Sequence, residues 1–141
     1  RYRAAGVADA VVPYCNLGLT LVERGKYDEA RGYLHEALEQ LYAQGRMALK
    51  GVVHAFILPS VAQARDWAAF DTHLSLATEL LDGGGYLDPD TARLAALAGD
   101  FANETGETER ARAAWGFAAQ HYLALGETAT AQALEARRAI D

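Results

Sequence analysis

The chain repeats one pattern of residues at steps of 40 and 41 positions, and this constrains its fold more than any single motif. Gly45, Gly85 and Gly126 stand at these two steps. Each unit contains stretches in which apolar residues recur every three or four positions, as in amphipathic helices. A pair of helices buries its apolar face only against its neighbours, so the pattern predicts three helical hairpins stacked in a row. A second set of positions repeats at the same steps: Ala30, Leu34 and Ala37; Phe70, Leu74 and Ala77; and Ala111, Trp115 and Ala118.

Composition places this pattern in a single all-α domain. The chain has 141 residues, 51% of them hydrophobic, which is enough for one well-buried core. It contains 30 alanines, the strongest helix formers, and little of the Val, Ile and Thr alternation that strands need. The 19 acidic and 13 basic side chains give a net charge of −6, which argues against a nucleic-acid partner. No apolar stretch approaches the roughly 20 residues of a membrane span, so no membrane partner is expected.

Capping residues and glycines mark the expected helix ends. Asp66, Asp88 and Thr108 each precede a stretch with helical periodicity, where a side-chain oxygen can accept a backbone N–H. Pro89 then occupies the first helical position, at which its missing N–H has no cost. Helices are expected to stop at glycines in the left-handed conformation, namely Gly25, Gly45, Gly106 and Gly126.

These signals predict one domain over residues 1–141, with repeats at about 7–44, 46–82 and 89–125 and a capping helix at about 127–140. Pro13 either starts the helix that carries Leu17 or kinks a longer one, and we expect the first. Because the chain begins at Arg1 and its one Met is Met47, we expect a piece of a longer protein. The seven helices are expected at about 7–24, 27–44, 46–65, 67–82, 89–105, 108–125 and 127–140.

The expected core combines large and small side chains. Ala30, Ala37, Ala77, Ala111 and Ala118 should let helix backbones approach closely. The large members are Leu17, Leu21, Leu34, Leu38, Ile57, Leu74, Leu80, Leu94, Trp115 and Leu123.

The first unit carries the residue series of a known repeat family. A large residue is followed by Leu-Gly and a further large residue, and a small, a large and a small residue come after the turn: Tyr14, Leu17, Gly18, Leu21, Ala30, Leu34 and Ala37. This series resembles the tetratricopeptide repeat, which implies a right-handed superhelical stack of antiparallel hairpins. The third unit fits in part, with Ala98-Gly99 in the Leu-Gly place. The second departs most, because Leu58 and Phe70 replace small residues and Pro59 interrupts its first helix.

The repeat length supports a narrower resemblance. A tetratricopeptide unit has about 34 residues, so steps of 40 and 41 add roughly one turn to each helix. Such long units, with the phrases from Arg65 to Phe70 and from Glu109 to Trp115, are similar to helical-repeat regions at the C-terminal ends of bacterial serine/threonine kinases and STAND-type signalling ATPases. This resemblance implies a cytoplasmic signalling or regulatory protein.

The family resemblance also implies a binding groove. In tetratricopeptide proteins the first helices of the hairpins line a concave face that receives an extended peptide or a helix. Asn16 occupies the place where peptide-binding members often hold an Asn that bonds the ligand backbone. The Lys/Arg cluster of a carboxylate clamp is missing, since Arg93 stands almost alone. The alternative is that the apolar groove residues are core, covered by neighbouring helices. The positions carried over are Val12, Cys15, Asn16, Leu19 and Glu23; Val52, Phe56, Pro59 and Gln63; and Arg93, Leu97, Asp100 and Asn103.

No pattern indicates catalysis, a metal or a cofactor, and none is expected. Gly83-Gly84-Gly85 lacks the strand and the Lys-Ser/Thr of a phosphate loop, so we expect a flexible hairpin turn. Cys15 lies in an apolar run with neutral neighbours and is expected to be a buried structural thiol. None of the four histidines has a second His or Cys at i+4, so we expect surface positions for His35, His54, His73 and His121.

The expected function is therefore a non-catalytic protein–protein interaction module that binds a partner through the first-helix face. The partner is expected to be another protein, a peptide or a second copy of the chain. The alternative is regulation in cis, in which the stack controls or dimerises a kinase or ATPase in the same polypeptide. A catalytic domain in the parent chain would favour this alternative.

Overall fold

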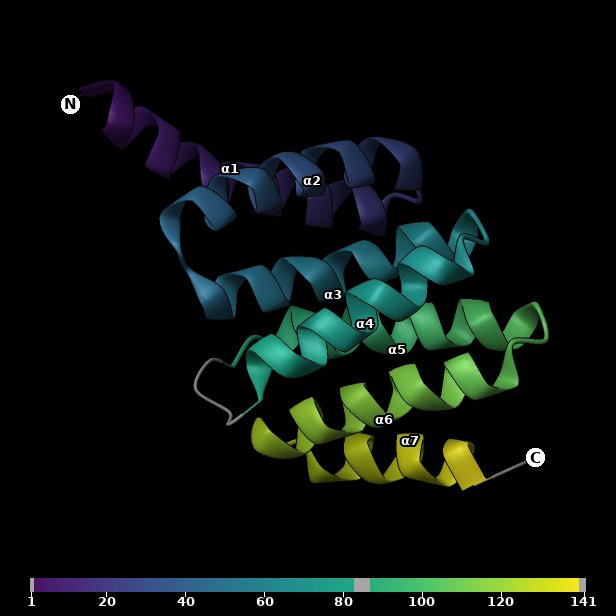
Figure 1. Ribbon diagram of the computed structural model, residues 1–141. Coiled ribbons are helices and arrows are strands. Elements are labelled where there is room, and N and C mark those ends of the chain that lie inside the picture. Colours follow the sequence, from purple (N-terminus) through teal and green to yellow (C-terminus); the bar gives the residue numbers. More distant parts are fainter. Residues whose placement is uncertain (1, 83–86, 140–141) are drawn as a thin grey trace.

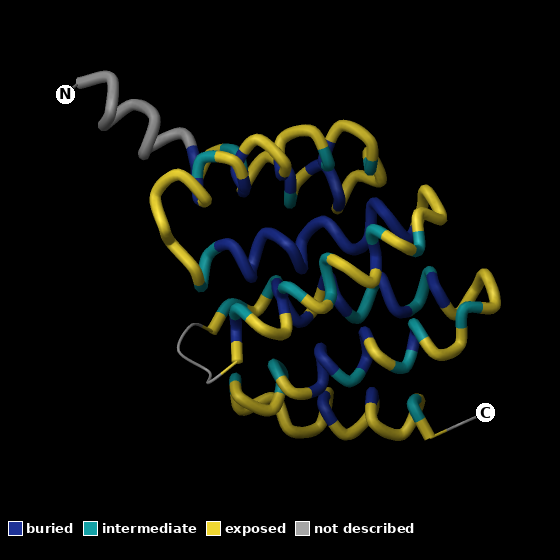
Figure 2. Tube along the Cα trace, viewed as in Figure 1, coloured by how far each residue is buried: buried dark blue, intermediate teal, exposed yellow. Residues whose placement is uncertain are grey.

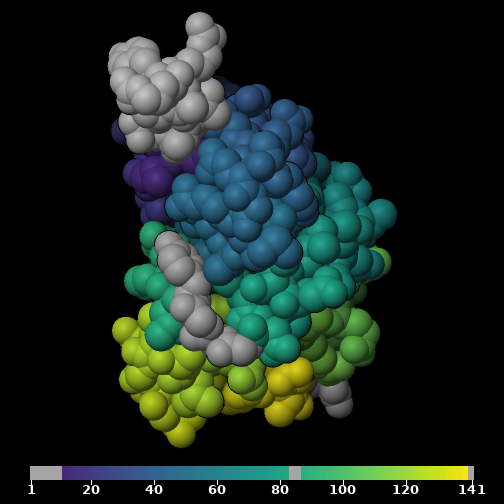
Figure 3. All heavy atoms as spheres, turned by 60° about the vertical axis from the view of Figure 1, so that its left-hand side comes forward, coloured from purple at the N-terminus to yellow at the C-terminus, as the bar shows by residue number. Residues whose placement is uncertain are grey.

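The computed structural model describes the backbone of residues 2–82 and 87–139 and the side chains of residues 11–82 and 87–139. Over these residues the fold is all-α, with seven helices and no strand. α1 packs with α2, α3 with α4, and α5 with α6, and α7 lies on α6. The hairpins follow one another in chain order (Figures 1 and 3). The helices are α1 (Tyr2–Glu23), α2 (Tyr27–Gln44), α3 (Met47–Gln63), α4 (Trp67–Leu81), α5 (Pro89–Glu104), α6 (Thr108–Ala124) and α7 (Thr128–Ala139).

Turns within the hairpins recur at the steps read from the sequence. In the first and third hairpins the turn contains Gly25 with φ of 75° and Gly106 with φ of 83°. The second hairpin has Arg65 at the equivalent place, with φ of 59° although this residue carries a Cβ atom. The expected left-handed helix ends are therefore confirmed, and the second hairpin keeps the same turn without a glycine. Gly45 and Gly126 also have positive φ, and Gly83, Gly84 and Gly85 lie outside the described residues.

Two of the three expected side-chain caps are present. The carboxylate of Asp66 accepts a hydrogen bond from the backbone N–H of Ala69 at 3.2 Å, and Asp88 accepts one from the second residue of α5 at 3.2 Å. The prediction for Thr108 is wrong, because Thr108 is the first residue of α6. Glu107 precedes it and makes no side-chain capping bond. The backbone of Glu107 nevertheless starts the helix.

Both interior prolines lie inside continuous helices, which corrects two predictions. Pro13 does not start its helix, since α1 begins at Tyr2 and runs through it. Pro13 is exposed, so water can hydrate a carbonyl that its missing N–H leaves free. Pro59 does not interrupt α3, which continues to Gln63. Packing of α3 against its neighbours outweighs the local cost of a proline, about 3 kcal/mol in a helix interior.

α3 is the centre of the molecule. Every residue from Lys50 to Ala62 is buried, because α3 contacts α2, α4 and α5 and touches α1 (Figure 2). Most of the expected core is confirmed, and the five small residues that were expected to let backbones approach are fully buried. Leu17 and Leu123 are wrong predictions, with 39% and 54% of their surface exposed. Leu74 and Leu80 are half-buried.

Between the second and third hairpins, the first helices pack on each other more closely than the second helices do. α5 packs extensively against α3, whereas α4 has few contacts with α6. The fold therefore has one well-packed side at α3 and α5 and a separation between α4 and α6 on the other side. Both places hold cavities.

Candidate interaction groove

A groove lies between α1 and the start of α5, with α3 as its floor. It encloses a cavity of about 260 Å³. α1 contributes Val12, Cys15, Asn16 and Leu19 at the spacing of one helix face. The remaining lining residues come from α3, from α5 and from the residues that lead into these two helices: Arg46, Leu49, Val52, Phe56, Leu87, Asp88 and Asp90.

Six of the residues carried over from the family pattern meet in this groove, but they have two different roles. Val12 is 52% exposed, and Asn16 is also exposed, so both form an accessible wall. Val52 and Phe56 are only 2% and 4% exposed and belong to the hydrophobic core. For these two, the structure matches the alternative in which the residues are core. A molecule bound in the groove can touch Val52 and Phe56 only at the floor.

Contacts between the first hairpin and α5 close one end of the groove. Arg93 donates to Glu23 at 2.6 Å, which joins α5 to the last residue of α1. The rings of Tyr27 and Phe101 meet edge to face, with centroids 5.7 Å apart. The hydrogen bonds to Asp90 and Glu23 raise the pKa of Arg93, so the guanidinium stays charged. Two predicted site residues, Glu23 and Arg93, thus bind each other.

The remaining predicted positions lie beyond this closed end. Asp100 accepts a hydrogen bond from Trp115 Nε1 at 3.1 Å and forms an ion pair with Arg137 at 2.9 Å. These contacts connect α5 to α6 and α7. The carboxylate of Asp100 is therefore occupied by the chain itself. Of the others, Pro59 is buried, Leu97 is half-buried, and Gln63 and Asn103 are exposed near helix ends.

The groove contains one buried thiol and one partly buried acid. Burial raises the pKa of the Cys15 thiol to about 11, and the confirmed buried position leaves it protonated near neutral pH. Burial also raises the pKa of Asp88, against the effect of its capping hydrogen bond to the backbone N–H of Asp90. Neither group is arranged as an activated nucleophile.

Three histidines converge on one another from three consecutive helices, which the sequence prediction missed. His54 is only 3% exposed, and its Nδ1 lies 2.9 Å from Nδ1 of the half-buried His73. His35 of α2 lies beside His73, with ring centroids 5.9 Å apart. On the other side of His54, Nε2 is 3.1 Å from the hydroxyl of Tyr42. The expectation of surface histidines is wrong for His54 and His73.

Electrostatics in this histidine cluster favour the neutral rings. Burial, and then the neighbouring His73, His35 and Lys50, lower the pKa of His54 to about 4. Burial and His35 lower the pKa of His73 to about 4, although Asp66 acts in the opposite direction. A sequence signal was available, since the three histidines are spaced 19 residues apart. A helix with its turn has about this length, and each turn lies midway between two of the histidines. The three side chains therefore stand at the same height on neighbouring antiparallel helices.

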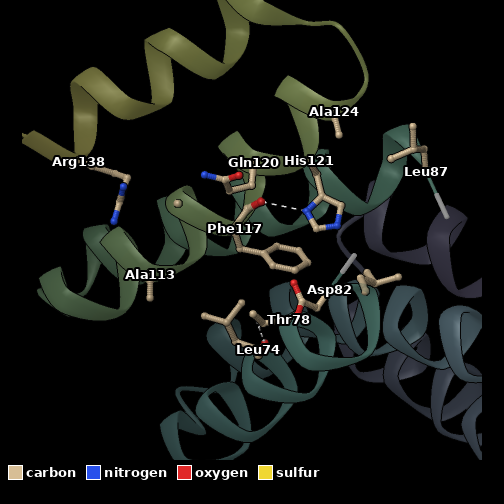
Figure 4. A pocket seen from close by; sticks show the side chains of 12 residues that line it. Leu74, Thr78, Asp82, Leu87, Ala113, Phe117, Gln120, His121, Ala124 and Arg138 are labelled. Carbon is tan, nitrogen blue, oxygen red and sulfur yellow. Dashed lines mark hydrogen bonds between the residues drawn. The ribbon is translucent and has the colours of Figure 1, made fainter. Parts of the chain in front are cut away.

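Another cavity, larger than the groove, lies between α4 and α6, away from the predicted residues. It measures about 620 Å³ and extends to Arg138 of α7. Figure 4 shows Leu74 and Phe117 facing it from the two sides, and His121 hydrogen-bonded through Nδ1 to the carbonyl oxygen of Phe117 at 3.0 Å. The walls are mainly apolar. Its position follows from the weak packing of α4 on α6.

Comparisons with known proteins give no relative. No family model, no curated protein and no solved structure matches this chain. Across the described helices, none is long and apolar enough to cross a membrane. Within residues 11–82 and 87–139, no group of three or more His, Cys, Asp and Glu side chains is arranged to hold a metal ion.

Proposed function

We propose that this chain is a non-catalytic protein-interaction module that holds a segment of a partner protein in the groove between α1, α3 and α5. The observation that carries the proposal is the groove itself. The first helices of all three hairpins contribute to one cavity, and its rim exposes apolar side chains. Exposed apolar surface in a concave site is typical of peptide and helix recognition.

The arrangement of the hairpins supports a tetratricopeptide-like stack as the scaffold. The left-handed turn positions Gly25, Arg65 and Gly106 recur at the sequence steps. α3 lies against both the preceding and the following hairpin, as the shared packing of a repeat protein requires. A right-handed superhelical stack and a cytoplasmic role in a bacterial signalling protein are part of the same proposal, on the resemblance of the long repeats.

The composition of the groove suggests how a segment would be held. Val12 and Leu87 rise from opposite walls and are 52% and 46% exposed, so an apolar side chain of the partner can be enclosed between them. Asn16 offers an amide donor and an acceptor to the partner's backbone. Arg46 and Asp90 stand at the rim with opposite charges. Because the Glu23–Arg93 ion pair closes the far end, the groove fits a short segment.

Site-specific photo-cross-linking tests this proposal. A photoreactive amino acid replaces Asn16 in the groove, and a control carries it at the exposed Gln132 of α7. Expressed in its native cells within the complete parent protein, the Asn16 probe should give a discrete product that the Gln132 probe does not. A product with another polypeptide supports recognition in trans, and a cross-link within the same polypeptide supports the cis-regulatory alternative. The absence of any product specific to Asn16 contradicts the proposal.

A further inference from the structure

A second surface lies at the end of the stack, on the outer side of the first hairpin. A hollow of about 270 Å³ is lined by Tyr14 of α1 and by four residues of α2. Arg31 and Tyr42 of α2 point the other way, since they contact α3 through Ser60 and His54. The surface, which we call the end face, consists of Tyr14, Leu17, Glu29, Gly32, Tyr33 and Glu36.

The end face has an aromatic centre. The rings of Tyr14 and Tyr33 lie 6.0 Å apart at an interplanar angle of 40°. Leu17 lies one turn after Tyr14 on α1, and both Leu17 and Tyr33 have 39% of their surface exposed. Rigid tyrosine rings bury area on binding at little cost in conformational entropy, and such side chains often anchor interfaces.

Gly32 gives an independent reason to expect close contact from outside. A glycine in a helix interior is unfavourable relative to alanine, so a packing reason is expected. Within the helical parts of residues 11–82 and 87–139, the other glycines have a neighbouring side chain where a Cβ atom would stand, but Gly32 has nothing within 4 Å. Close approach by another molecule would give this position a packing reason to lack a side chain. The glycines with a neighbour are Gly18, Gly51, Gly99 and Gly116.

The charges around the hollow specify the occupant. Glu29 and Glu36 lie one turn on either side of Gly32, both are exposed, and neither forms an ion pair with any described residue. A second copy packed on this surface would bring these carboxylates near their own equivalents, and like charges repel. A cationic partner would instead meet unpaired acids on both sides of an aromatic centre.

We propose that the end face binds an amphipathic α-helix whose apolar side packs on Tyr14 and Tyr33 and whose Lys or Arg side chains pair with Glu29 and Glu36. The helix backbone approaches most closely at Gly32. This surface lies outside the groove of the proposed function, and the two proposals succeed or fail separately.

Fluorescence anisotropy with a defined peptide tests the proposal. The probe is a labelled, amidated peptide of about 18 residues, or five helical turns, with Leu on one face and Lys flanking it. A scrambled peptide of the same composition lacks the apolar face. The variant E29K/E36K reverses the end-face charge, and E79K/E104K makes the same net charge change at exposed residues of α4 and α5, outside both the end face and the groove.

We expect the amphipathic peptide to bind the native chain and the scrambled peptide to bind at least about tenfold more weakly. E29K/E36K should lower the affinity for the amphipathic peptide about tenfold or more, whereas E79K/E104K should change it by less than about threefold. Gly32→Gln should weaken binding without lowering the thermal midpoint, since no described residue obstructs a side chain there.

Several results would overturn this inference. Equal binding by the two charge variants would show that the peptide responds only to net charge. Unchanged binding by Gly32→Gln would show that the bound helix does not approach closely at Gly32. A dimer in light scattering that dissociates on Tyr33→Glu would identify a second copy as the occupant instead.

Discussion

The indole of Trp115 occupies the space beside Gly99 that a side chain on Gly99 would need: an added Cβ atom would come within 2.5 Å of Trp115 Cδ1. Gly18 and Leu34 have the same relationship, again with a closest approach of 2.5 Å. Each of these residues precedes its counterpart by 81 positions. The sequence repeat is therefore also a repeat of one helix–helix contact, in which a glycine on the first helix receives a large side chain from the second.

Gly99→Ala should lower the free energy of unfolding by about 1–3 kcal/mol, as overpacked substitutions do. Trp115 cannot yield easily, because it is 4% exposed and its Nε1 donates to Asp100. Gly32→Ala is the matched control and should stabilise the chain by up to about 1 kcal/mol through helix propensity. Urea denaturation followed by circular dichroism measures both. A neutral or stabilising Gly99→Ala would contradict the close contact.

This contact shows what sequence could and could not predict. The spacing that relates Gly18 to Gly99 and Leu34 to Trp115 was enough to predict the hairpins, their order and their turns. Local propensity misjudged Pro59, because the cost of a proline is a local property while the burial of α3 is a tertiary one. Leu17 and Leu123 satisfy the helical period but lie on outer faces, which periodicity alone does not distinguish from inner ones.

The candidate groove positions came from the resemblance to the tetratricopeptide repeat. It implied positions 12, 15, 16 and 19 on the first helix and positions 52 and 56 in the next repeat, and these six residues line one cavity. The Glu23–Arg93 ion pair that closes the groove depends on the tilt of one hairpin against α5, which no spacing records. The histidine cluster was missed because ligand-like spacing was sought within single helices, while these side chains come from three.

The histidine cluster should make stability depend on pH between about 4 and 6.5. Folding lowers the pKa of His54 and His73 from 6.5 to about 4, so the unfolded chain binds more protons in this window. Stability is therefore fully present above pH 6.5 and is lost as the pH falls toward 4. For His54 the difference amounts to at most about 3 kcal/mol.

Urea denaturation at intervals between these pH values measures the effect. Acidic groups also titrate near the lower limit, so the native chain is compared with His73→Gln and with His121→Gln, which removes a histidine outside the cluster. The slope of stability against pH should fall in His73→Gln and persist in His121→Gln. Identical slopes in all three proteins would show that the cluster does not titrate as inferred.

Cys15 should react slowly in the folded chain. Burial raises the pKa of its thiol to about 11, so on the order of 0.1% is thiolate at pH 8. Ellman's reagent should modify Cys15 at least about a hundredfold more slowly in buffer than in strong urea. Rapid modification of the native chain would mean that the groove exposes the thiol.

Asp100 should prove to be a residue that holds α7 in place. Asp100→Ala removes the partner of both Trp115 Nε1 and Arg137, and should lower the free energy of unfolding by about 1–3 kcal/mol. Hydrogen exchange should accelerate in α7 more than in α1. Asn103→Ala, at an exposed position on the same helix, should have little effect. Equal stability of the Asp100→Ala and Asn103→Ala variants would show that the contacts of Asp100 with Trp115 and Arg137 do not stabilise the fold.

The most direct measurement of the central claim is the affinity of the chain for the partner that cross-links through Asn16. Val12→Glu and Leu87→Glu change exposed residues on opposite walls of the groove, and Leu123→Glu changes an equally exposed leucine outside it. Titration calorimetry should show at least about a tenfold loss of affinity for the two groove variants, because a buried charge is costly. The Leu123→Glu control should bind like the native chain, with helicity equal in all four proteins. Unchanged affinity in both groove variants would show that the groove is not the binding site.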